Sequence, residues 1–405
     1  MQELKRIINY KRIILLLIAA TVNVVFFLYD NKPVMDEDII NKENVAHETY
    51  IKNYHEEVNA IIDNADKLKK YSIFNKAGSF SYANILQTAR DFERVKNVIL
   101  PEDEYKGVQA YTTYYYQYFF TMLVMMFVIY DMFAQRDNGM WSITYSCANG
   151  RIMYAIKQTG VIVVTGAFTH TLIYWSTFIA AMLQRGGVRD LVNPVQTIEA
   201  FDKFTYPWSK IKYVTVLYLI SMVCIVALCI TIWGVFVMFR NRVYALVTML
   251  IFAAVEQFIY SHIDIHSVWN GLHYINIINI ININATFSSY RNWGVGTYVF
   301  PVFSVVLFVH IICAGVIGYI AINVSASMKP YKNTTFIKRF TDCVSAGCQK
   351  ILARIPFLFK EIHKFIFTSH CGWVVVVMLT VTAYVCQTGQ YHYTDDNKYM
   401  ERENM

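Results

Sequence analysis

A short polar stretch, residues 131–159, separates two long apolar runs and reads DMFAQRDNGMWSITYSCANGRIMYAIKQT. It has a charged start, breaks at Gly139 and Gly150, and an aromatic segment from Trp141 to Tyr145 between them. Apolar side chains exposed on a connecting loop mark a surface for a protein partner or a membrane interface. We therefore expect this loop to be the contact site through which another protein moves the apolar part of the chain. The alternative is an ordinary connecting loop.

Apolar runs like those beside this loop recur along the whole chain. Of the 405 residues, 56% are hydrophobic and only 16% are charged, whereas soluble domains are about 25% charged. A helix of about 20 apolar residues crosses the hydrocarbon core of a bilayer. The sequence therefore predicts an all-α, polytopic helical membrane protein with about seven transmembrane helices. The predicted spans are 13–29, 112–133, 160–183, 213–239, 243–262, 298–322 and 372–387.

The distribution of lysine and arginine predicts the orientation of the chain. If the N-terminus is cytoplasmic, the cytoplasmic segments hold 17 basic residues and the short segments on the other side hold 8. Basic residues are retained on the cytoplasmic side, whereas long loops cross largely regardless of charge. We expect a multi-pass protein of the cell membrane with a cytoplasmic N-terminus and an extracytoplasmic C-terminus. The net charge of +7 then reflects the basic residues that orient the chain in the membrane, and it does not indicate a nucleic-acid partner.

Residues 1–29 are predicted to form an interface helix and the first transmembrane helix. Four basic residues precede the apolar run, as in a signal peptide, but residues 26–30 read FFLYD and contain no small-residue cleavage site. The run is therefore interpreted as an uncleaved anchor. For residues 1–12, the alternative to an interface helix is a simple basic leader.

Residues 30–111 are predicted to form an extracytoplasmic helical domain. Apolar residues recur at spacings of three and four between positions 40 and 68 and again between positions 82 and 99, which indicates two helices. Pro101 is expected to end the second one. The segment holds 15 acidic residues, 11 basic residues and no cysteine. We expect an antiparallel helical hairpin with a mixed, solvated surface and no catalytic site.

The transmembrane core is predicted to cover residues 112–323 and to include an unusual outer element at 262–297. Within it the sequence HYINIINIININA spaces three asparagines by three residues, with isoleucine between them. The segment is too short and too polar to span a bilayer, so we interpret it as a re-entrant helix. Polar backbone at membrane depth is tolerated where it is buried in protein or lines water. The competing interpretation is a buried strand.

Few ionisable groups lie in the predicted spans, and the acid among them is Glu256, with His170 and His310 as the imidazoles. A charged residue within a transmembrane segment is by default a candidate functional residue. Glu256, the adjacent Gln257 and Asn276 are therefore the candidate intramembrane residues for contact with a substrate. Structural pairing is the alternative for Glu256, and we expect the histidines to be satisfied within the bundle.

Several motifs of catalytic and nucleotide-binding proteins are absent from the sequence. There is no Gly-x4-Gly-Lys-Ser/Thr loop for ATP, no Gly-x-Ser-x-Gly, no His-Glu-x-x-His and no paired Cys-x-x-Cys. A membrane enzyme acting on lipid-linked substrates would need acidic or histidine clusters at an interface, and the sequence has none. We therefore expect no enzymatic activity, no metal and no cofactor.

The last part of the chain resembles its beginning. Residues 324–371 are basic and are predicted to form cytoplasmic amphipathic helices, followed by the seventh span within 372–405. FLFKEIHKFIF at 357–367 is weakly similar to MQELKRIINYK at 1–11, and an apolar run and an acidic stretch follow each of them. We expect a second copy of the unit, with the start of a second extracytoplasmic segment, to begin at about residue 357.

Residues 1–323 resemble the membrane subunit of a type-2 ABC transporter, a permease whose ATPase is a separate chain. The likeness lies in the N-terminal interface helix, six spans, a re-entrant element before the sixth, and a charged cytoplasmic segment ending in Gly150-Arg151. Among these proteins the chain is most similar to Gram-positive bacterial permeases with a helical extracytoplasmic domain between spans one and two. The patches that carry this likeness are 195–201, 256–260 and 274–276.

The resemblance implies a function and partners. The chain would move an amphiphilic or peptide-like substrate across the cytoplasmic membrane, in export, using ATP bound by a separate cytoplasmic ATPase subunit. A second permease unit, identical or different, would complete the pathway within the lipid bilayer. Asp137 stands where those permeases often have glutamate. The residues that would contact the ATPase are Asp137, Met140, Trp141, Ile143, Tyr145 and Arg151. The alternative is a membrane-anchored sensing or interaction protein without transport activity.

Overall fold

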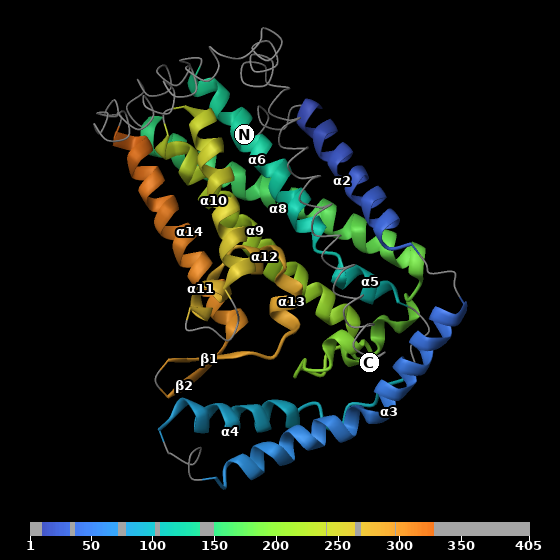
Figure 1. Ribbon diagram of the computed structural model, residues 1–405. Helices are drawn as coiled ribbons and strands as arrows, with labels where there is room; N and C mark the ends of the chain where they lie inside the picture. Colours follow the sequence, from blue (N-terminus) through green and yellow to red (C-terminus); the bar gives the residue numbers. More distant parts are fainter. Residues whose placement is uncertain are drawn as a thin grey trace, which may run out of the picture. The chain divides into compact units, whose positions relative to one another are not determined.

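Six long apolar helices form the body of the protein (Figure 1). The structure is a computed structural model that describes residues 10–32, 37–71, 78–101, 106–137, 150–239, 241–263, 269–295 and 297–327. Each of these six helices is long and apolar enough to cross a membrane. The chain is thus a multi-pass, helical membrane protein. The six are α2 (Tyr10–Asp30), α6 (Tyr116–Asp137), α8 (Gly150–Arg185), α9 (Lys210–Met238), α10 (Arg242–His262) and α14 (Val302–Ser327).

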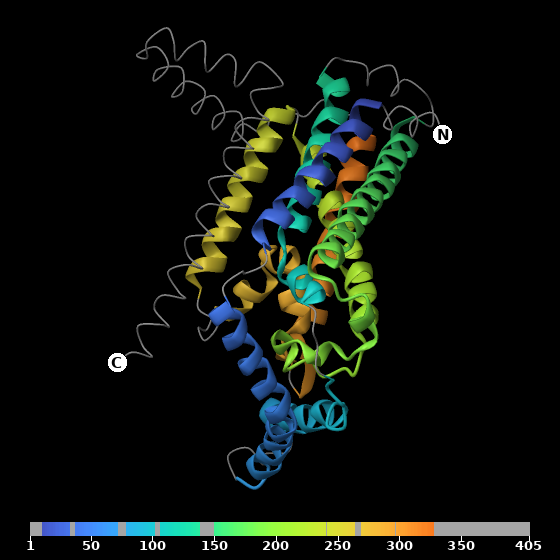
Figure 2. The ribbon, with the colours of Figure 1, turned by 90° about the vertical axis from the view of Figure 1, so that its right-hand side faces the viewer.

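Helix α9 lies at the centre of this bundle and packs against α6, α8, α10 and α14. Its most extensive contact is with α14, where Gly234 allows a close approach, because a side chain there would overlap Ile317. Helix α2 packs against α8 and α6 (Figures 1 and 2). We call the end of the bundle where α2 finishes and α6 begins the hairpin end. The end where α6 finishes and α8 begins is the loop end.

Two predicted spans begin later than expected, because a separate element takes up their first residues. Residues up to Thr113 belong to α5 (Gly107–Thr113), and Tyr114 is extended, so α6 begins at Tyr116 and not at 112. Residues 298–301 pair as a strand, so α14 begins at Val302 and not at 298. In the other direction, α8 already begins at Gly150 and takes in part of the predicted loop.

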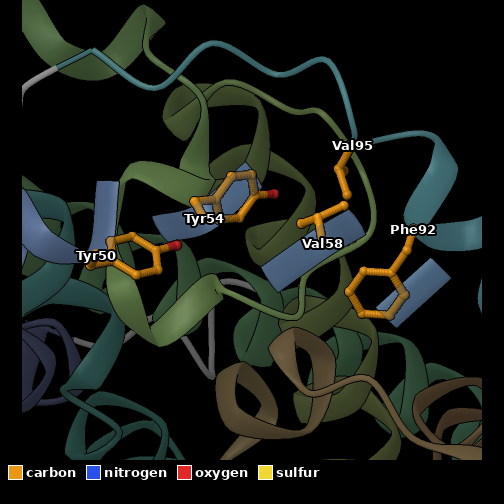
Figure 3. Packing of buried hydrophobic residues seen from close by; sticks show 5 residues of the cluster. All are labelled: Tyr50, Tyr54, Val58, Phe92 and Val95. Atoms are coloured by element: carbon orange, nitrogen blue, oxygen red, sulfur yellow. The ribbon is translucent and has the colours of Figure 1, made fainter. Parts of the chain in front are cut away.

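The predicted helical hairpin is present as α3 (Glu37–Leu68) and α4 (Phe80–Glu93). The hydroxyl of Ser79 caps α4 by accepting a hydrogen bond from the backbone N–H of Tyr82 (3.3 Å). Helix α4 ends at Glu93, well before Pro101, because the chain turns there and buries Val95. The hairpin has its own apolar core (Figure 3). It consists of Tyr50, Tyr54, Val58, Phe92 and Val95.

A small antiparallel sheet, which the sequence did not predict, joins the hairpin to the bundle. Strand β1 (Asn292–Val295) pairs with β2 (Tyr298–Pro301), and α4 packs against both. Gly294 of β1 lies under the ring of Phe80, where a larger residue would overlap the ring. The sheet leads directly into α14, so the hairpin contacts the start of this transmembrane helix.

The predicted re-entrant helix is three short helices in the structure. They are α11 (Asn270–Ile275), α12 (Ile278–Ile281) and α13 (Ile283–Ser288). These helices connect α10 to the sheet and contact α14 at the hairpin end of the bundle. The connection between α8 and α9 contains three 3-10 turns, η1 (Arg189–Val192), η2 (Val195–Thr197) and η3 (Glu199–Phe201).

Several predictions fall outside the described residues. These are the interface helix in residues 1–9, the central part of the loop at 138–149, and residues 328–405, which hold the predicted amphipathic helices, the seventh span and the second copy of the unit.

Candidate functional site

The two candidate residues Glu256 and Asn276 meet at the hairpin end of α10. The side-chain amide of Asn276 donates a hydrogen bond to the backbone carbonyl of Glu256 (2.7 Å). In return, the Glu256 carboxylate accepts one from the backbone N–H of Ile277 (3.1 Å). Asn276 is buried and Glu256 is half-buried. We call this pair of contacts the Glu256–Asn276 clasp; it ties α10 to the element that follows it.

The other asparagines of this element explain why it is not one helix. The amide of Asn279 donates to the carbonyls of His273 (2.6 Å) and Tyr274 (3.0 Å), which end α11. The side chain of Asn276 accepts from the N–H of Ile278 (2.8 Å) and starts α12. Asparagine side chains that bond nearby backbone favour turns over helix continuation. The break between α11 and α12 is therefore satisfied by local hydrogen bonds.

Gln257, the third candidate in this region, is half-buried on α10 beside the clasp. Its backbone carbonyl accepts a hydrogen bond from the hydroxyl of Ser261 (2.9 Å). One turn further, Tyr260 stacks on His273 of α11, with 4.6 Å between the ring centres. The end of α10 is thus held to the folded-back element by polar bonds and by one ring contact.

The hairpin is attached to the bundle through polar side chains that the sequence analysis did not select. Asp91 of α4 accepts hydrogen bonds from Tyr290 (3.0 Å) and Gln87 (2.9 Å) and pairs with Arg94 (3.0 Å). Asn292 of β1 donates to Asn84 (2.8 Å). Burial raises the pKa of Tyr290 to about 12, so its hydroxyl keeps its proton at neutral pH.

A second attachment joins the hairpin to the connection between α8 and α9. The hydroxyl of Tyr50 donates to the backbone carbonyl of Gln196 (2.7 Å). The side chain of Gln196 is itself buried and donates to the carbonyls of Phe204 (3.0 Å) and Tyr206 (2.6 Å), which fixes the loop. Burial raises the pKa of Tyr50 and that of Tyr54, the latter to about 12. The hairpin therefore bridges the α8–α9 loop and the segment that leads into α14.

The loop end presents the part of the predicted ATPase-contact segment that the structure describes. Arg151 lies exposed in the first turn of α8, and Asp137 is the last residue of α6. The guanidinium of Arg136 donates to the carbonyl of Phe236 (2.9 Å), so the end of α6 is fixed to the end of α9. The other candidates in this segment, Met140, Trp141, Ile143 and Tyr145, lie outside the described residues.

Polar groups inside the bundle are paired across helices. Asn23 of α2 donates to Thr177 of α8 (2.7 Å) and accepts from Tyr114 (3.0 Å). His170 of α8 is buried and hydrogen-bonds Ser221 of α9 (2.9 Å). Polar bonds between helices hold membrane bundles together. These pairs therefore join α2, α8 and α9, and they agree with the expectation that His170 is satisfied within the bundle.

Among the described residues, no group of three or more histidine, cysteine, aspartate or glutamate side chains is arranged to hold a metal ion. Comparisons of the chain with protein-family models, with curated proteins and with solved structures found no match. The geometry itself therefore carries the functional argument. It consists of an acid near one end of an apolar helix, the folded-back element bonded to it, the hairpin at the same end of the bundle, and the ends of α6 and α8 at the other end.

Proposed function

We propose that this chain is the membrane permease subunit of an ABC transporter that moves an amphiphilic or peptide-like substrate, with export as the direction and a separate cytoplasmic ATPase as partner. The observation that carries the proposal is the folded-back element between α10 and α14. Polar, broken helices at membrane depth are tolerated where they are buried in protein or line a pathway. The Glu256–Asn276 clasp holds such an element at one end of the helix bundle.

Helix α8 supplies a route by which motion at the loop end would reach the hairpin end. It runs without a break from Gly150 to Arg185, a length of about 53 Å at 1.5 Å per residue. At its far end Arg185 donates to the carbonyls of Asn31 (3.2 Å) and Lys32 (2.9 Å), just after α2. A displacement of Arg151 by an ATPase would therefore be transmitted along α8 to the start of the hairpin.

The proposed orientation places the loop end in the cytoplasm and the hairpin outside. In this orientation the ATPase would bind the ends of α6 and α8. The clasp and the hairpin would then lie where substrate leaves the membrane. A second permease unit, identical or different, would complete the pathway.

The test is an affinity purification of the tagged chain from the membranes of its own host in mild detergent, with mass spectrometry of the co-purifying proteins. We expect a stoichiometric cytoplasmic ATPase. Arg151→Glu should reduce its recovery at least about tenfold, since a reversed charge in a contact costs more than 1.4 kcal/mol. Arg189→Glu, an exposed charge reversal at the hairpin end, is the matched control and should leave recovery unchanged. A purification without an ATPase, in a detergent that preserves a known transporter complex, would overturn the proposal.

A sensing or interaction protein is the second candidate, and the hairpin favours it. Its hydrogen bonds to Gln196 and Tyr290 would allow a conformational change in the hairpin to reach both the α8–α9 loop and the segment that leads into α14. This function predicts no ATPase partner. It also predicts that Arg151→Glu has no effect, so the same purification separates the two candidates.

A further inference from the structure

The middle of α10 is uncovered on every side. Residues Ile251 to Val255 are five consecutive exposed residues, although five residues of a helix point in all directions around its axis. Ile251 is 59% exposed and Val255 is 48% exposed. Helix α14, by contrast, keeps one covered face, with Ala314 at 3% and Ala321 at 0%. Over these five residues every side of α10 is therefore exposed.

Both ends of α10 are nevertheless fixed. At the loop end, Ala245 and Leu246 are buried. At the hairpin end, the clasp bonds Glu256 to Asn276 and Ile277. The exposed residues Ile251 to Val255 thus lie between two fixed ends of α10.

A carboxylate stands at one end of this stretch. Glu256 is half-buried, and among the described residues no lysine, arginine or histidine forms an ion pair with it. A charged group at membrane depth is costly and is normally paired. The Glu256 carboxylate accepts a hydrogen bond from the N–H of Ile277, which is a neutral donor.

Glu256 thus places a negative charge at the end of the exposed apolar residues. Opposite charges attract, and the attraction is stronger at low dielectric. The site therefore favours a ligand of opposite charge, a cation.

We propose that α10 binds a cationic amphiphile, with the cationic group at Glu256 and the apolar body along residues 251–255. The inference rests on the proposed function, because it names the substrate class of that permease. Charge complementarity distinguishes this ligand from a neutral lipid tail, which would cover the same apolar residues without selecting the carboxylate. It also distinguishes the ligand from an anionic amphiphile, which Glu256 repels.

The test is photolabelling of the purified full chain in phosphatidylcholine nanodiscs, without ATP or ATPase. The probe is dodecylamine with a diazirine on its alkyl chain, and dodecanoic acid with the same diazirine is its anionic match. We expect saturable labelling of α10 by the amine and only unsaturable background from the acid. Equal labelling by both probes would show that ordinary lipid covers α10. Saturable exclusion of both probes, with cross-links between α10 helices of two chains, would show that a second copy covers it. Either result overturns the inference.

Substitutions locate the cationic group. Glu256→Gln should raise the half-saturating amine concentration at least about tenfold. The amide oxygen of glutamine still accepts from Ile277, so the fold is retained. Ala253→Lys places an ammonium three residues before Glu256 on the same side of α10 and should abolish saturable labelling. Val316→Lys, on an exposed side of α14 and outside the proposed site, controls for a lysine in a transmembrane helix and should leave labelling near its original level.

Unchanged half-saturation in Glu256→Gln would overturn the inference. Because labelling needs no ATPase, its failure is distinguishable from that of the proposed function. A chain that recovers an ATPase but does not select the amine keeps the function and loses the inferred ligand. A chain that selects the amine but recovers no ATPase keeps the ligand site and loses the transporter.

Discussion

Two neighbouring transmembrane helices, α9 and α10, differ in how much of them the protein covers. In their most apolar stretches, 61% of the residues of α9 are buried, against 11% of those of α10. Both are apolar, and both begin at a polar cap, Ser209 and Asn241 respectively. Lipid tails are as apolar as a protein core, so hydrophobicity alone does not bring membrane helices together. Close packing along its length holds α9 against its neighbours, whereas α10 is held by hydrogen bonds at its end.

The largest expected effect comes from filling the closest contact of α9. Gly234→Leu would overlap Ile317 and push α14 away, at a cost of about 3 kcal/mol or more. The measurement is unfolding of the purified chain by SDS in mixed micelles. Gly315→Leu is the matched control, because no atom lies within 4 Å of a side-chain carbon added there. Equal losses in the two variants would mean that close packing does not separate α9 from the lipid-exposed helices.

Truncation of one isoleucine in each helix tests the same contrast more gently. Ile225 of α9 is 1% exposed, so Ile225→Ala should leave a cavity and cost about 2 kcal/mol. Ile251→Ala in α10 should change stability by less than about 0.5 kcal/mol, because the protein makes few contacts to lose. The same SDS titration compares them. A cost for Ile251→Ala as large as that for Ile225→Ala would show that α10 is covered by protein after all.

The Glu256–Asn276 clasp at the hairpin end of α10 is expected to contribute less to stability than these packing contacts of α9. Asn276→Ala removes the bond to the Glu256 carbonyl and the bond from Ile278, at about 1 kcal/mol in total. Hydrogen–deuterium exchange should become faster at the end of α10 and stay the same in α9. Asn323→Ala removes a bond within α14 (Nδ2 to the Tyr319 carbonyl, 3.0 Å) and serves as the control. If exchange in α10 is unaltered by Asn276→Ala, the clasp does not hold this helix.

The smallest effect is expected from the attachment of the hairpin. Tyr290→Phe removes the hydroxyl that donates to Asp91 and should cost about 0.5–1 kcal/mol, since the site is only partly buried. Faster exchange should appear in α4 and in residues 269–295, with α9 again unchanged. Tyr298→Phe alters an exposed tyrosine of the same sheet and should have no effect. Loosening of α9 by Tyr290→Phe would contradict the separation of the two helices.

Part of the candidate site was visible in the sequence, and the reason differs from residue to residue. Glu256 and Asn276 stood out because polar groups are rare in apolar surroundings, and the structure brings them together. Tyr50, Asp91 and Gln196 gave no such signal, because polar side chains are ordinary in a solvated hairpin or loop. Their partners lie far along the chain, Asp91 being bonded by Tyr290, and no local pattern announces such a contact.

Hydropathy and helical periodicity are local properties, so the transmembrane helices up to residue 327 and the helical hairpin could be predicted from the chain's residues alone. Which of these helices lies at the centre, where the Ile-Asn element breaks and how the hairpin is attached depend on contacts between distant residues, which the three-dimensional structure shows. Lipid and protein are equally apolar neighbours for a membrane helix. Burial therefore depends on which surfaces fit together, as at Gly234, and on which distant polar groups meet, as at Glu256 and Asn276.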